Sequence, residues 1–180
     1  MKLTEKQSGV LRGMLLGASI TLCIIGLGSY LNPFGYTNSL NFIDKLTVAI
    51  LWCLIPATFL AISIGRLAKH RFFTPEDIDG GGLSGNDTKQ ASLLQTLLQN
   101  TLEQTLLASL VYCAWSIVMP STWLSVVPIS AIAFGLGRIL FFIGYKKGAP
   151  SRALGFTLSF YPSIAMLVIV IGNVLWQHIS

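Results

Sequence analysis

The third long apolar stretch of the chain carries the residues best suited to chemistry. Six polar side chains recur there at intervals of one, three or four residues: Ser92, Gln95, Thr96, Gln99, Asn100 and Glu103. Such spacing places them on one face of a helix. Glu103 is the one carboxylate deep within an apolar segment, where burying a charge costs a few kcal/mol. The pattern predicts a polar face that lines a crevice or a polar helix interface.

The next apolar stretch offers a complementary charge. Arg138, Phe141, Phe142 and Tyr145 recur at helical spacing, and Arg138 is the only charge before the end of the stretch. An ion pair between Glu103 and Arg138 is geometrically reasonable, and it could simply lock two helices together. Alternatively, both side chains line a site for a polar, anionic ligand, because Lys146, Lys147 and Arg152 follow closely and arginine suits carboxylates.

Composition defines the elements that must position these groups. Of the 180 residues, 53% are hydrophobic and 11% are charged, against roughly 25% charged in an average soluble domain. The mean hydropathy is +0.69. These values exclude a water-soluble globule and a disordered chain. The net charge of +5 would suggest nucleic acid on a soluble domain, but a membrane explains it better. We predict an all-α integral membrane protein with no nucleic-acid partner.

Five apolar segments are long enough to span a bilayer, which takes about 20 residues. They form a single membrane domain and cover residues 9–31, 42–68, 90–119, 122–145 and 151–177, with one polar loop at 70–89. The first segment resembles a signal peptide, but its apolar part exceeds the 7–15 residues typical of such a region. We therefore predict a retained transmembrane helix.

The distribution of Lys and Arg between alternate loops predicts the orientation. Ten of the 12 cations flank one side if the segments alternate: Lys2, Lys6, Arg12, Arg66, Lys69, Arg71, Lys89, Lys146, Lys147 and Arg152. Lys45 falls on the other side, and Arg138 lies within a segment. We predict a cytoplasmic N-terminus and an outside C-terminus.

The sequence predicts no metal site. His70 and His178 fall at opposite membrane faces and cannot share an ion. The Asp77-x-Asp79-Gly80 run lacks the ligands that would complete a calcium loop.

Three runs resemble the MAPEG family of membrane-associated proteins in eicosanoid and glutathione metabolism, which includes microsomal glutathione transferases and leukotriene and prostaglandin E synthases. They are LQNTLEQ at 98–104, RILFFIGY at 138–145 and APSR at 149–152. The resemblance covers residues 43–176, so segment 9–31 is an addition to the family's four-helix bundle. The loop at 71–80 also looks like that of bacterial members, which implies a bacterial inner membrane.

The resemblance implies a homotrimer that binds glutathione, as co-substrate, between protomers near the cytoplasmic face. A hydrophobic small-molecule substrate would enter from membrane lipid. Asn100 and Glu103 match residues that hold the tripeptide, with Gln99 beside them, and Arg138 and Tyr145 match residues lining the same site. Arg152 matches the arginine that stabilises the thiolate and is the expected catalytic residue. A free thiol titrates near 8.5, and an adjacent guanidinium favours its nucleophilic form. The implied activity is that of a glutathione transferase or peroxidase acting on hydrophobic electrophiles.

Some positions depart from the family pattern. Thr96 and Gln99 stand where several members carry an arginine, Phe141 where others have Tyr or His, and Ala153 where the prostaglandin synthases have Ser. A non-catalytic lipid-binding or scaffold protein of the same family is therefore an alternative. A transporter that uses Glu103 as a proton carrier is a weaker one, because no further intramembrane carboxylate forms a relay.

Overall fold

The computed structural model describes residues 3–80 and 87–179. Within these residues, five long helices follow one another: α1 (Glu5–Gly26), α2 (Phe42–Phe73), α3 (Lys89–Val118), α4 (Val126–Gly144) and α5 (Ala149–Ile179). A π-helical turn, Leu27–Leu31, extends α1. All five elements are long and apolar enough to cross a membrane. The predicted all-α, multi-pass membrane architecture is confirmed, including the helix built by the first apolar segment.

Local capping explains where three of the helices begin. α1 begins at Glu5, ahead of the apolar run, because the Gln7 amide donates to Thr4 Oγ1 (3.2 Å) and the Thr4 amide donates to Gln7 Oε1 (2.9 Å). Asn41 and Asp44 form the same reciprocal pair at the start of α2. Thr88 caps α3 by accepting from the Ala91 amide. Each such cap satisfies amides that have no partner in the first helical turn.

The polar loop is shorter than predicted, because α2 continues past Ala68 and ends at Phe73. After a short 3-10 turn, Pro75–Asp77, the buried Asp77 carboxylate ties the loop to both helices. It accepts from the Thr88 amide (2.9 Å) and the Thr88 hydroxyl (2.7 Å), and it contacts His70 Nε2 (2.9 Å). The two bonds from Thr88 are the main reason that the pKa of Asp77 lies below its ordinary value. Residues 81–86 of the predicted loop lie outside the described residues.

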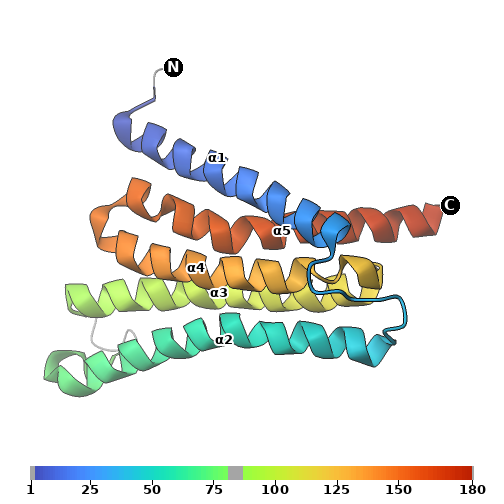
Figure 1. The fold of residues 1–180 in the computed structure, drawn as a ribbon. Coiled ribbons are helices and arrows are strands. Elements are labelled where there is room, and N and C mark those ends of the chain that lie inside the picture. Colours follow the sequence, from blue (N-terminus) through green and yellow to red (C-terminus); the bar gives the residue numbers. More distant parts are fainter. Residues whose placement is uncertain (1–2, 81–86, 180) are drawn as a thin grey trace.

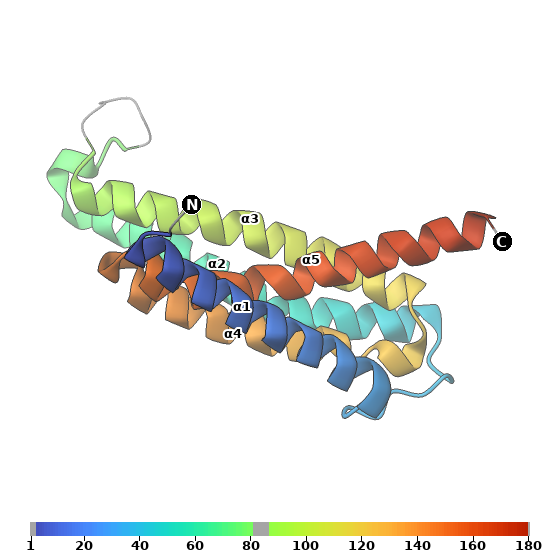
Figure 2. The ribbon, with the colours of Figure 1, turned by 90° about the horizontal axis from the view of Figure 1, so that it is seen from above.

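Successive helices run antiparallel to one another: α1, α3 and α5 run from left to right in Figure 1, and α2 and α4 run back. α3 packs between α2 and α5, α4 packs against α5 and α2, and α1 lies on the outer side of α5. Figure 2 shows α1 crossing over α4 and α5, and the C-terminal end of α5 leaving the bundle. The alternation brings nine of the ten flanking cations to one end, and Lys2 lies outside the described residues. Lys45 is at the other end, where its ammonium donates to the Met119 carbonyl (2.7 Å).

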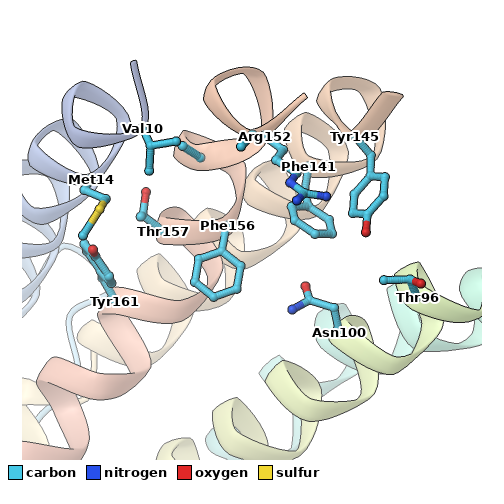
Figure 3. A pocket seen from close by; sticks show the side chains of 12 residues that line it. Val10, Met14, Thr96, Asn100, Phe141, Tyr145, Arg152, Phe156, Thr157 and Tyr161 are labelled. Atoms are coloured by element: carbon cyan, nitrogen blue, oxygen red, sulfur yellow. The ribbon is translucent and has the colours of Figure 1, made fainter. Parts of the chain in front are cut away.

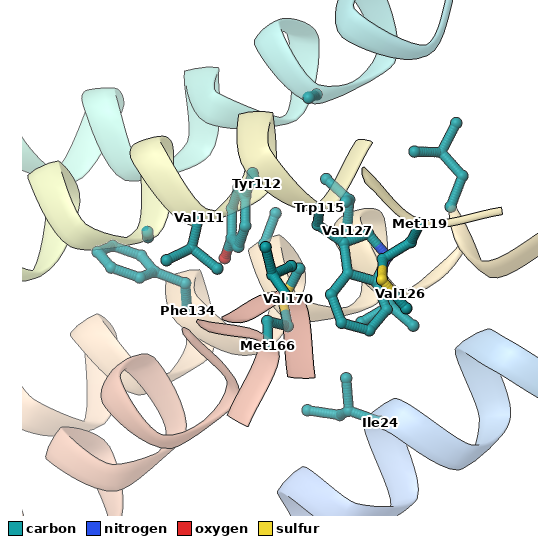
Figure 4. Close-up of a cluster of buried hydrophobic side chains, with 14 of the residues drawn as sticks. Ile24, Val111, Tyr112, Trp115, Met119, Val126, Val127, Phe134, Met166 and Val170 are labelled. Carbon is teal, nitrogen blue, oxygen red and sulfur yellow. The ribbon is translucent and has the colours of Figure 1, made fainter. Parts of the chain in front are cut away.

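The hydrophobic core fills the half of the bundle near the α3–α4 connection. Tyr112 and Trp115 of α3 pack there against Phe134 of α4 and Met166 of α5, and Ile24 reaches in from α1 (Figure 4). The polar residues singled out in the sequence lie in the other half, toward the cationic end. The fold therefore separates a well-packed apolar half from a half that contains polar groups.

Candidate functional site

Arg138 is the centre of the polar half. Its side chain is 0% exposed, although it lies in a membrane-spanning helix. One terminal nitrogen donates to Asn100 Oδ1 (2.9 Å), and the other donates to Gln104 Oε1 (3.0 Å) and Ser159 Oγ (2.8 Å). The centre of the Phe141 ring lies 4.5 Å from the guanidinium carbon. Neutral oxygens and an aromatic face thus hold this cation, and among the described residues its Nε has no hydrogen-bond partner.

The prediction of an ion pair between Glu103 and Arg138 is wrong. Glu103 is exposed on α3 and accepts from Gln99 Nε2 (2.8 Å). Among the described residues, the carboxylate forms no salt bridge with Arg138, because α3 presents Thr101 and Gln104 to α4 instead. Successive helical residues point about 100° apart, so turning Gln104 toward Arg138 turns Glu103 away.

Close packing of α4 on α5 brings Arg138 to Ser159. A Cβ added at Gly137 would lie 2.8 Å from the Gly155 carbonyl oxygen and 2.9 Å from the Ser159 amide nitrogen. A Cβ at Gly155 would collide with the backbone of Phe141. Only glycine at both positions allows the two backbones to approach this closely. The small residues around Arg138 therefore serve packing, as their pattern suggests.

A cavity of about 390 Å³ opens beside this cluster. It lies within the range of roughly 300–1,000 Å³ that small-molecule sites occupy. Its polar end is formed by Thr96 and Asn100 of α3, Tyr145 at the end of α4 and Arg152 of α5 (Figure 3). Its apolar end is formed by residues of α1 and α5: Val10, Met14, Phe156, Thr157 and Tyr161, with Phe141 between the two ends. Ala149 and Ala153 of α5 complete the lining.

Arg152 is the charged group at the polar end. It is half-buried, and its guanidinium carbon lies 4.3 Å from the centre of the Tyr145 ring. Stacking on the ring restrains the arginine, so that its donors are held at the cavity mouth. Asn100 Oδ1 is already engaged by Arg138, which leaves the Asn100 amide group as the donor for a ligand. A cation, an amide and a phenol beside an apolar wall can bind an amphipathic anion.

The structure brings together only some of the predicted site residues. Asn100, Tyr145 and Arg152 line the cavity. Arg138 is not part of the lining but donates a hydrogen bond to Asn100. Gln99 and Glu103 lie on the exposed side of α3, outside the cavity lining. Sequence reasoning missed Val10 and Met14. The signal that could have found them is the spacing of Gly9, Gly13 and Gly17, which predicts a close helix contact for α1.

Comparison with known proteins gives one match. A family model described as the MAPEG family matches residues 46–172, which run from the first turns of α2 to the second half of α5 and leave α1 outside. No curated protein and no solved structure matches the chain.

Proposed function

Because the chain belongs to the MAPEG family, we propose that it is a membrane glutathione transferase or peroxidase whose site is the cavity between α1, α3, α4 and α5. Glutathione occupies the polar end, and a hydrophobic electrophile occupies the apolar end. The observation that supports this most directly is that three predicted residues, Asn100, Tyr145 and Arg152, line one cavity although they come from different elements.

Arg152 is the proposed catalytic residue. A guanidinium within about 4–6 Å of the thiol lowers the thiol pKa by roughly 1–3 units and so raises the thiolate fraction at neutral pH. In conjugation, the thiolate sulfur forms a bond to an electrophilic carbon, and the bond from that carbon to its leaving group breaks, with the electron pair departing on the leaving group. In peroxide reduction, the sulfur attacks one peroxide oxygen and the O–O bond breaks, so that the other oxygen leaves with the electron pair and takes up a proton to give an alcohol or water. A second glutathione then converts the sulfenic acid to a disulfide with release of water.

The tripeptide's carboxylates and amides would meet the other polar groups. The Asn100 amide is oriented by Arg138, whose buried charge also makes the polar end attractive to anions. Thr96 and Tyr145 add hydroxyl groups to the polar end of the cavity. Gln99 and Glu103 lie next to this mouth on the exposed face of α3, where they would contact ligand that reaches past Asn100 or a neighbouring protomer.

We further propose a homotrimer in a bacterial inner membrane, with the N-terminus in the cytoplasm. The exposed side of α3 carries Ser92, Gln95, Thr96, Gln99 and Glu103 within a membrane-spanning helix. Exposing such a face to lipid is costly, and covering it with another copy of the chain removes that cost. The end that gathers the cations is the one expected in the cytoplasm.

A second candidate function is non-catalytic lipid binding. The cavity is lined mostly by apolar side chains, and Thr96 and Phe141, two of the positions that depart from the family pattern, lie in its wall. A protein of this kind would hold a lipid at the apolar end without chemistry.

The test measures glutathione binding and the thiol pKa in nanodiscs. We expect saturable binding and an ultraviolet thiolate signal, with the thiol pKa rising by about 1–3 units in Arg152→Ala. Arg12→Ala, which removes an exposed arginine outside the cavity, is the matched control and should leave both unchanged. No saturable glutathione binding would refute the proposal. A native lipid that copurifies in the cavity, with no turnover of electrophiles, would establish the second candidate.

A further inference from the structure

We propose that α1, which lies outside the family match, forms one wall of a channel for a linear alkyl chain, and that Val10 and Met14 set the chain lengths accepted. The proposal rests on the proposed function, because the alkyl chain belongs to the hydrophobic co-substrate of that site. It assigns a specificity-determining role to an element that the four-helix core does not contain.

α1 is clamped to α5 along a stripe of glycines. A Cβ added at Gly9 would lie 2.8 Å from Pro150 Cβ, and one at Gly13 would lie 2.8 Å from Ala153 Cβ. At Gly17 it would overlap the side chain of Thr157. The Thr157 hydroxyl also donates to the Gly13 carbonyl (3.3 Å). Because the glycines of α1 pack directly against side chains of α5 along two helical turns, the position of α1 relative to the cavity is well determined.

This contact directs two larger side chains of α1 into the cavity. Val10 and Met14 lie one turn apart on α1 and line the apolar end opposite Phe156 (Figure 3). Val10 is half-buried and Met14 is 41% exposed, so neither is locked in the protein core. A flexible methionine beside a branched aliphatic side chain adapts to an apolar ligand without defining a rigid shape.

A second cavity continues from the first along α1. It also has a volume of about 390 Å³ and is lined by Leu3, Lys6, Gln7, Val10, Leu11, Met14 and Ala149. Val10, Met14 and Ala149 border both cavities. These three side chains therefore lie between the two cavities, whose combined lining extends from Arg152 to Lys6.

The arrangement and lining of the two cavities favour an alkyl chain over a compact ring system. Five of the seven residues that line the second cavity are aliphatic or methionine, the other two are Lys6 and Gln7, and none is aromatic. A flexible chain can pass Val10 and Met14 and use both spaces, whereas a compact ring fills the first cavity only. We therefore assign the co-substrate to the class of linear, long-chain electrophiles, with the reactive atom near Arg152.

The test uses S-alkylglutathiones with chains of one to twelve carbons, which place the tripeptide and the alkyl group in one molecule. In the wild-type protein we expect Kd to fall by up to about fourfold per methylene, from about 0.8 kcal/mol for each buried CH₂, until the channel is filled. In Val10→Trp and Met14→Trp, Kd should stop decreasing at a shorter alkyl chain than in the wild type. Kd for the ten-carbon compound should be at least tenfold higher. In Met14→Ala, Kd should go on decreasing to longer alkyl chains than in the wild type.

Leu15→Trp is the matched control, because Leu15 neighbours Met14, is 60% exposed and lines neither cavity. In Leu15→Trp, Kd should depend on alkyl-chain length as it does in the wild type. Kd for S-methylglutathione should stay within twofold in every variant, which also shows that each has folded. If S-methylglutathione binds but all variants share one chain-length series, the alkyl group lies in lipid and this inference alone is overturned. If neither glutathione nor S-methylglutathione binds the wild type, the proposed function fails and the inference fails with it.

Discussion

Replacing Arg138 by methionine is the most informative single change in the polar half. Methionine keeps much of the length of the side chain but removes the charge and every donor. Four acceptors then lose a hydrogen bond. Asn100 Oδ1, Gln104 Oε1 and Ser159 Oγ lie 2.8–3.0 Å from the guanidinium nitrogens, and Thr101 Oγ1 lies 3.5 Å away. The substitution therefore tests whether these bonds outweigh the cost of keeping a cation away from water.

Opposing effects determine how much Arg138→Met changes the free energy of unfolding. Each buried acceptor left without a donor costs about 1–3 kcal/mol. Ser159 can still donate to main-chain carbonyls of α5, and Asn100 is only half-buried, so their losses fall at the lower end. Removing the buried charge returns part of its desolvation penalty. We expect a net destabilisation of about 3 kcal/mol, which corresponds to a fall in Tm of roughly 6–12 °C for a chain of this size.

Thermal unfolding in detergent, followed by the intrinsic fluorescence of the four tryptophans, which include the buried Trp115, measures this effect. Leu136→Met is the control, because Leu136 is on the same helix and 55% exposed, and it should change Tm by no more than about 2 °C. Arg138→Met should also weaken glutathione binding, since Asn100 loses the contact that orients it. A Tm that is unchanged or raised would refute the reasoning, because the desolvation penalty would then exceed the value of the hydrogen bonds.

Two further predictions concern the packing of α1 and the loop. Gly17→Leu should lower Tm by several degrees because its side chain would displace Thr157, whereas Gly26→Leu on the same helix, whose Cβ meets no atom within 4 Å, should not; equal Tm values in the two variants would contradict the glycine clamp. The folded-state pKa of Asp77 is below its ordinary value near 3.9, so its stabilisation is complete above that value and is lost as pH falls through the folded pKa. The Tm difference between wild type and Asp77→Asn should therefore persist from pH 8 to pH 5 and shrink below about pH 4, and a difference that vanishes between pH 7 and pH 5 would contradict this.

The helices and the polar face of α3 were predictable because both depend on local pattern. An apolar run of sufficient length must form a helix in a bilayer, since each backbone amide needs a partner there. The three- and four-residue spacing from Ser92 to Glu103 then places these side chains on one side of that helix. Neither inference requires knowledge of which helices are neighbours.

The contacts of Arg138 were not predictable in the same way. Glu103 and Gln104 are adjacent in sequence, and a rotation of α3 by about 100° decides which of them faces α4. That rotation depends on packing along the whole helix, including Thr101 and Gln104 against α4 and Tyr112 in the core. The glycine spacing in α1 likewise predicts a close contact but does not identify α5 as the partner, so the apolar end of the cavity could not be assembled from sequence.

The clamp between α1 and α5 has a consequence for biosynthesis. Gly13 and Thr157, which share a hydrogen bond, are 144 residues apart in the chain. Protein synthesis adds about 5–20 residues per second, so roughly 7–30 s pass between the synthesis of Gly13 and that of Thr157. During that interval its glycine face has no matching surface within the chain, and the cavity lacks a wall. The cavity is therefore complete only after the last helix has been inserted.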